Sequence, residues 1–136
     1  MSLPGIPAGA AGGPDAALGA IRRVSSQTGG DFAAMVRMAS LESGLDADAQ
    51  ATTSSARGLF QFTRGTWLDM VERHGAKHGL ADAAAALRQG ADAPTQERIL
   101  ALRDDPEISA RMAHELANDN RSVLEARVGG EIGEAD

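Results

Sequence analysis

A glutamate and a serine, Glu42 and Ser43, stand where a predicted helix meets a long polar loop. Upstream of them, apolar residues recur every three or four positions and predict a buried helix face: Phe32, Met35, Val36 and Ala39. We expect Glu42 to lie half-buried one turn beyond that face, in the last turn of the helix. Burial and the negative end of the helix macrodipole both favour a protonated carboxyl group. Glu42 could then donate the proton that cleavage of a glycosidic bond requires, whereas a surface glutamate at a frayed helix end is the alternative.

Residues 45–57 are polar, small and aperiodic, and they predict a loop. A loop of this length within a compact domain is usually either functional or disordered. The four consecutive hydroxyl side chains at 52–55 can satisfy buried backbone groups locally, which an exposed linker would not need. We therefore expect an ordered loop that crosses a cleft, with Thr52 or Ser54 hydrogen-bonded near Glu42.

The order of residues along this stretch resembles the soluble lytic transglycosylase family, which belongs to the lysozyme-like superfamily. The family pattern is Glu-Ser, a loop with small hydroxyl residues, and then Gly-Ala-x-Gly-Leu-Met-Gln. The second part of the pattern here reads Ser55-Ala56-Arg57-Gly58-Leu59-Phe60-Gln61-Phe62, followed by Thr66-Trp67. This version is similar to a branch common in alphaproteobacteria. Ser55 and Phe60 depart from the pattern, and the match covers residues 31–72.

The resemblance implies a role for each matching position. Glu42 is the catalytic acid and base. Thr52, six residues before Gly58, stands where the family has a hydroxyl group near the acid and the N-acetyl group of the sugar, and Ser54 is a second candidate from the same run. Gly58 lets the backbone approach the sugar, because glycine has no Cβ.

Three further positions have two interpretations each. The resemblance implies that Gln61 faces the substrate, and that Phe60 and Phe62 wall the cleft or pack beneath it. The alternatives are a local hydrogen bond at a helix start for Gln61, and ordinary core positions for the two phenylalanines. Trp67 shares a helix face with Met70, and we expect it in the core rather than on a sugar-binding surface.

The family cleaves the MurNAc-β-1,4-GlcNAc bond of peptidoglycan and forms 1,6-anhydroMurNAc, with a single carboxylate and no cofactor. The resemblance therefore implies a periplasmic or cell-envelope enzyme whose partners are glycan strands and a protein of the envelope machinery. Two alternatives stay open: a hydrolytic muramidase on the same scaffold, and a non-catalytic domain that binds glycan or helps to assemble the envelope. The family's domain also continues with a helix that bears a cleft-lining tyrosine. Because this chain has no tyrosine, we expect a domain that lacks its C-terminal part.

Helical periodicity predicts an all-α domain over residues 15–128, and the resemblance makes it lysozyme-like. A Gly/Ala/Pro lead-in at 1–14 is expected to be disordered, and an acidic tail at 129–136 to be flexible. Asp31 and Asp105 suit helix N-caps, and Gly44 suits a helix C-terminus. No strand is expected.

Composition excludes several classes of function. The net charge is −6 and no cluster of Lys and Arg exists, which argues against binding nucleic acid or an anionic membrane surface. The absence of cysteine excludes disulfides and thiolate zinc sites. No apolar run approaches the ~20 residues that span a bilayer. His74 and His78 have the i, i+4 spacing of metal ligands but lack the intervening glutamate of the metalloprotease motif, so we expect no metal site.

Overall fold

The computed structural model describes residues 13–135, and the side chains as far as residue 127. The elements in order are α2 (Pro14–Thr28), α3 (Phe32–Ser43), α4 (Arg64–His74), the 3-10 turn η1 (Gly75–His78), α5 (Ala81–Arg88), α6 (Ala93–Ala101), the 3-10 turn η2 (Leu102–Asp104) and α7 (Pro106–Ala135). Over this range the prediction of an all-α fold is confirmed. The only β-type pairing among these residues is two isolated bridges. Most of the predicted lead-in, residues 1–12, lies outside the described residues.

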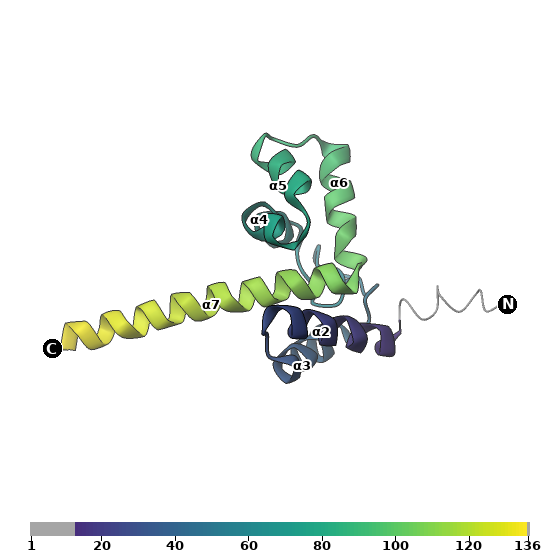
Figure 1. The fold of residues 1–136 in the computed structure, drawn as a ribbon. Helices are drawn as coiled ribbons and strands as arrows, with labels where there is room; N and C mark the ends of the chain where they lie inside the picture. Colours follow the sequence, from purple (N-terminus) through teal and green to yellow (C-terminus); the bar gives the residue numbers. More distant parts are fainter. Residues whose placement is uncertain (1–12, 136) are drawn as a thin grey trace.

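Helix α7 is the axis on which the other helices are arranged. Its 30 residues correspond to a length of about 45 Å. Helices α2 and α3 lie on one side of α7, and α4, α5 and α6 lie on the other side (Figure 1). The C-terminal half of α7 extends beyond both groups. Between residues 13 and 135, no helix is both long and apolar enough to cross a bilayer.

Local signals position the helix ends, as the sequence predicted. The Asp31 carboxylate accepts a hydrogen bond from the backbone N–H of Ala34 at 3.0 Å and so begins α3. Gly44 ends α3 in the left-handed conformation, with φ of 66°. The Asp105 carboxylate accepts from the backbone N–H groups of Glu107 and Ile108 at the start of α7.

The C-terminal end of α7 differs from the prediction. A helix end was expected before Gly129 and Gly130, with a flexible tail over 129–136, but the helix continues through both glycines to Ala135. A glycine inside a helix costs only about 1 kcal/mol relative to alanine, so two glycines weaken a helix without ending it. Good helix formers flank this pair, including Glu125, Ala126 and Arg127.

A single core joins the helices on the two sides of α7. Its buried members are Ala17, Ile21, Val24, Met35, Ala39, Leu59, Phe60, Phe62, Trp67, Met70, Val71, Ile99, Leu100, Ala110, Met112 and Ala113. Trp67 is fully buried, its ring meets Phe62 edge-on at 5.0 Å, and its indole N–H donates to the carbonyl of Ile99 at 2.9 Å. Trp67 is therefore a core residue, as predicted.

Candidate active site

Glu42 lies in the last turn of α3, as the sequence predicted, but its side chain is exposed rather than half-buried. The expectation of burial was wrong because the buried face of α3 continues from Ala39 to Ser43, four residues on, and not to Glu42. Leu41, on the other side of Glu42, is 80% exposed. The carboxylate of Glu42 therefore stands at the edge of the helix packing and not beneath it.

Glu42 borders a hollow of about 250 Å³. The hollow lies between α3, the segment that leads into α4, and α7, and its lining consists of Met38, Glu42, Phe60, Gln61, Phe62, Thr63, Thr66, Ala113 and Leu116. Glu42 is the one acidic residue on this lining. The hollow therefore brings together one carboxylate, an aromatic wall and a few hydroxyl and amide groups, the composition of a small ligand site.

Three of the residues that the resemblance implied for the site share this hollow with Glu42: Phe60, Gln61 and Phe62. Phe60 and Phe62 are buried in the core at 6% and 4% exposure, and each also contributes to the lining. Both phenylalanines are thus core residues that also border the hollow, and the walling role that the resemblance implies stays a prediction.

Gln61 has an unusual backbone conformation, and its side-chain amide is hydrogen-bonded to two backbone carbonyls. Its φ is 55°, in the left-handed region that non-glycine residues rarely adopt. Its amide nitrogen donates to the carbonyls of Gly58 at 2.8 Å and Ala49 at 3.1 Å. These bonds hold the residue in that conformation and join it to the loop, so the helix-start bond of the alternative interpretation is not the bond that forms.

Ser43 connects α3 to the same segment. Its hydroxyl donates to the carbonyl of Leu59 at 2.6 Å and also lies 3.1 Å from the carbonyl of Ala39. The Ser43 oxygen accepts from the backbone N–H of Asp46 at 3.2 Å. A serine next to the candidate acid thus positions both the acid's helix end and the residues opposite it, a role that sequence analysis did not assign.

Gly58 is not at the hollow. It is buried, its φ is 90°, and a Cβ added to it would lie 2.1 Å from the carbonyl oxygen of Arg103. Glycine is therefore required at position 58 because the Arg103 carbonyl of the protein's own backbone approaches it closely. The prediction that Gly58 lets the backbone approach a sugar was wrong.

The guanidinium of Arg103 is hydrogen-bonded to backbone carbonyls at the C-terminal end of the loop and just after it. Arg103 is only 6% exposed, and it donates to the carbonyls of Ser55 at 2.7 Å and Phe62 at 3.1 Å. Burial lowers the pKa of Arg103. Beside it, Arg57 forms a two-point ion pair with Asp104, at 2.7 and 2.5 Å, whose hydrogen bonds raise the pKa of Arg57. Arg57 and Arg103 thus hold the loop, together with the hydroxyls of Ser54 and Ser55, which accept from the backbone N–H groups of Ala56 and Arg64.

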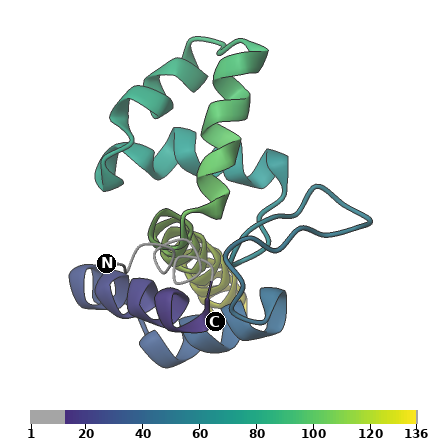
Figure 2. The ribbon, with the colours of Figure 1, turned by 90° about the vertical axis from the view of Figure 1, so that its right-hand side faces the viewer.

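Thr52 and Ser54 are not near Glu42 in the way that we expected. Both side chains are exposed, and neither borders the hollow. The Ser54 hydroxyl accepts from the backbone N–H of Ala56 at 3.2 Å, which is a bond within the loop. The bridge between Gln50 and Arg57 closes the loop at its base, so the residues between them project from the body (Figure 2). The loop therefore does not cross the hollow.

His74 and His78 face carboxylates of α7. His74 Nε2 donates to Asp119 at 2.9 Å and His78 Nε2 to Glu115 at 2.7 Å, and Lys77 donates to Glu115 at 3.2 Å. Burial by itself would raise the pKa of Glu115, but the bonds from His78 and Lys77 outweigh burial and hold that pKa below its usual value. The pKa of Asp119 is lowered in the same way, mainly by His74. These groups anchor α4 and η1 to α7.

Among residues 13–135, no group of three or more His, Asp or Glu side chains could hold a metal ion. The lining of the hollow offers one carboxylate with aromatic, amide and hydroxyl neighbours. No model of a known protein family matches the chain.

Proposed function

We propose that this protein is a peptidoglycan lytic transglycosylase that cleaves the MurNAc-β-1,4-GlcNAc bond, with Glu42 as its single acid and base. One observation carries the proposal: Glu42 borders the same hollow as Phe60, Gln61 and Phe62. Those three residues stand at the positions that the sequence resemblance marks for the substrate. They reach Glu42 only through the tertiary fold, since they follow it by many residues in the chain.

The proposed reaction needs one carboxyl group in two successive steps. Glu42 donates its proton to the glycosidic oxygen as the bond from that oxygen to C1 of MurNAc breaks, and GlcNAc leaves with a hydroxyl group. The substrate's own N-acetyl group stabilises the positive charge at C1. Glu42 then removes the proton of the C6 hydroxyl, whose oxygen bonds to C1 and closes the 1,6-anhydro ring. No water is consumed, and Glu42 ends protonated as it began.

The lining of the hollow supports a mechanism with one carboxylate. The common glycosidase mechanism uses two carboxyl groups, about 5–9.5 Å apart, on either side of the scissile bond. Glu42 is the one acid on this lining, and the nearby loop acids Asp46 and Asp48 do not border the hollow.

The exposure of Glu42 determines what the substrate must contribute. A glycan strand that fills the hollow would cover Glu42 and exclude water, which favours the protonated form. In this proposal the bound substrate therefore completes the environment in which Glu42 acts as an acid. The substrate would also place the protein in the periplasm or cell envelope, next to the proteins that assemble the envelope.

A non-catalytic glycan-binding domain is the second candidate, and the exposure of Glu42 in the free protein is the observation that favours it. Purified sacculi incubated with the protein separate the candidates. Mass spectrometry of the released fragments should find anhydro-muropeptides, which lack the mass of one water relative to the products of a hydrolytic muramidase.

Glu42→Gln removes the proton and keeps the shape, so it should reduce this release by about 10²–10⁴-fold. Glu125→Gln is the matched control, because Glu125 is an exposed residue of α7 that does not border the hollow. Hydrated fragments would identify a hydrolase, and co-sedimentation with sacculi without any fragments would identify a binding domain. Equal release by Glu42→Gln and the original protein would contradict the proposal.

A further inference from the structure

A second hollow of about 210 Å³ adjoins the first. Met38 and Ala113 border both hollows, so the two are neighbouring compartments between α3 and α7. The second compartment lies toward the turn at Gly29 and Gly30, which joins α2 to α3. Nothing in the proposed reaction uses it.

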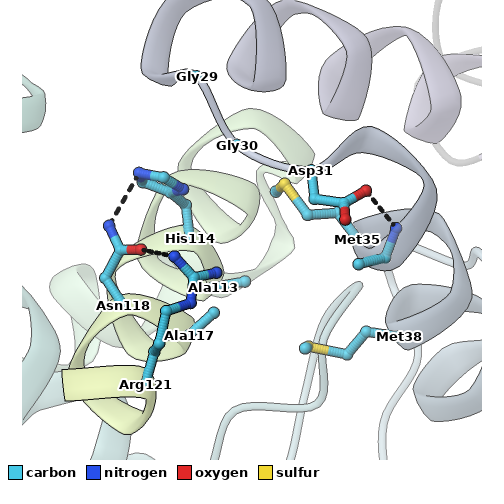
Figure 3. A pocket seen from close by; sticks show the side chains of 11 residues that line it. Gly29, Gly30, Asp31, Met35, Met38, Ala113, His114, Ala117, Asn118 and Arg121 are labelled. Atoms are coloured by element: carbon cyan, nitrogen blue, oxygen red, sulfur yellow. Dashed lines mark hydrogen bonds between the residues drawn. The ribbon is translucent and has the colours of Figure 1, made fainter. Parts of the chain in front are cut away.

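The second hollow has one apolar side and one polar side. Met35 and Met38 of α3 face polar side chains of α7 across the hollow (Figure 3). The polar residues are His114, Asn118 and Arg121, at successive turns of one helix face. Pockets of mainly apolar lining with a few convergent polar groups are the usual form of small-ligand sites.

Hydrogen bonds order the polar side. The Asn118 amide nitrogen lies 3.2 Å from Nε2 of His114, and a guanidinium nitrogen of Arg121 lies 3.5 Å from the Asn118 amide oxygen. Burial lowers the pKa of His114, which favours the neutral ring. A neutral His114 ring accepts from Asn118 at Nε2 and keeps its proton at Nδ1. The side that His114, Asn118 and Arg121 form therefore presents hydrogen-bond donors at defined positions.

The lining of the second hollow carries one guanidinium, that of Arg121, and one carboxylate, that of Asp31. Arg121 is exposed, and among the described side chains no carboxylate pairs with its guanidinium. Asp31 is the one acid on the lining, and its carboxylate is engaged at the start of α3, where it accepts from Ala34 N at 3.0 Å. A ligand carboxylate on the α7 side of the hollow would therefore meet a guanidinium that pairs with no carboxylate among the described side chains, the group best suited to hold it at two points.

We propose that the second hollow binds a short aliphatic peptide through a carboxylate at Arg121, with its apolar part against Met35 and Met38. The volume of the hollow limits the ligand to a small one, because drug-sized molecules occupy pockets of about 300–1,000 Å³ and this hollow is smaller. Identifying the source of the peptide rests on the proposed function. The muramyl sugars of peptidoglycan carry short peptides with alanine and free carboxylates, and a strand at Glu42 would present such a stem to the adjoining compartment.

The first test uses the dipeptide N-acetyl-L-alanyl-D-glutamate and the full chain labelled with ¹⁵N. Amide shifts should concentrate at residues 29–31 and 113–121, and Arg121→Gln should weaken binding roughly tenfold. Arg127→Gln is the matched control, because Arg127 is exposed on the same helix outside the hollow. Ala117→Leu fills the hollow without changing its charge and should also abolish binding. No shifts in these residues at millimolar dipeptide, or equal affinity in Arg121→Gln, would overturn the proposal.

The second test identifies the source of the peptide. Glu42→Gln protein is mixed with glycan strands that carry stems and with strands from which an amidase has removed them. Tighter binding of the stem-bearing strands, lost in the double variant with Arg121→Gln, supports a stem site, and equal binding of both strands overturns it. The assay measures binding alone, so a failure of the cleavage proposal would appear in the anhydro-muropeptide assay and not here.

Discussion

The hydroxyl of Ser43 donates to the carbonyl oxygen of Leu59 at 2.6 Å and joins the end of α3 to the segment opposite it. Leu59 is fully buried and immediately precedes Phe60 and Gln61 of the first hollow. Ser43 immediately follows Glu42. This bond therefore constrains the spacing between the candidate acid and the residues that face it.

Removal of the Ser43 hydroxyl should loosen that spacing. Ser43→Ala leaves the buried Leu59 carbonyl without its partner, and we expect the free energy of unfolding to fall by about 1–3 kcal/mol in urea titrations. Ser40→Ala is the control, because Ser40 is an exposed residue of the same helix and should change stability by under about 0.5 kcal/mol. If both variants were equally stable, the bond would contribute nothing.

Gly58 and Gly65 should respond in opposite directions to alanine. Gly58→Ala combines a positive φ with a Cβ 2.1 Å from the Arg103 carbonyl, so we expect a loss of about 3 kcal/mol or more. A Cβ at Gly65, in the first turn of α4, meets no atom within 4 Å and should stabilise the helix by up to about 1 kcal/mol. Thermal unfolding of the two variants measures both effects, and a tolerated Gly58→Ala would show that the contact with Arg103 relaxes.

Gln61→Glu tests whether the amide nitrogen of Gln61 holds the loop. A carboxylate of the same shape cannot donate to the Gly58 and Ala49 carbonyls, and its charge would face both oxygens. We expect a loss of about 2 kcal/mol or more in the free energy of unfolding. Gln89→Glu provides the comparison, since Gln89 is exposed at the end of α5 and should tolerate the change. Similar stability of the two variants would mean that these bonds are dispensable.

Glu115 should make stability depend on pH in the acidic range. Its pKa is lower in the folded chain than the usual glutamate value of 4.5, so its ionised form stabilises the fold above that value. The contribution is lost as the pH falls through the folded-state pKa. Glu115→Gln should therefore cost on the order of 2–3 kcal/mol near neutral pH, and the gap to the original protein should narrow on acidification.

Urea titrations at several pH values check this prediction, with Glu125→Gln as the control on the same helix. Glu125 is exposed, whereas Glu115 is only 8% exposed and accepts from His78 and Lys77. The control should follow the original protein at every pH. If the difference in free energy of unfolding between Glu115→Gln and the original protein stayed constant from neutral to acidic pH, the contribution of Glu115 to stability would not depend on its ionisation.

The sequence by itself determined the helices and most of their ends. Asp31, Gly44 and Asp105 act on backbone groups only a few residues away, so their effect can be predicted without the rest of the fold. The apolar spacing around Trp67 likewise predicted its place in the core. Gly129 and Gly130 are the exception, because glycine weakens a helix without ending it.

The tertiary structure alone decided which residues meet. Glu42 is exposed because the buried face of α3 passes through Ser43, and Thr52 and Ser54 project because the loop closes at its base. Gly58 is required by a carbonyl of Arg103, 45 positions further along the chain by residue number. The second hollow likewise forms only where α3 meets α7. A local pattern of residue types predicts which face of a helix is buried, but it does not say which distant residues meet that face or where a hollow forms between them.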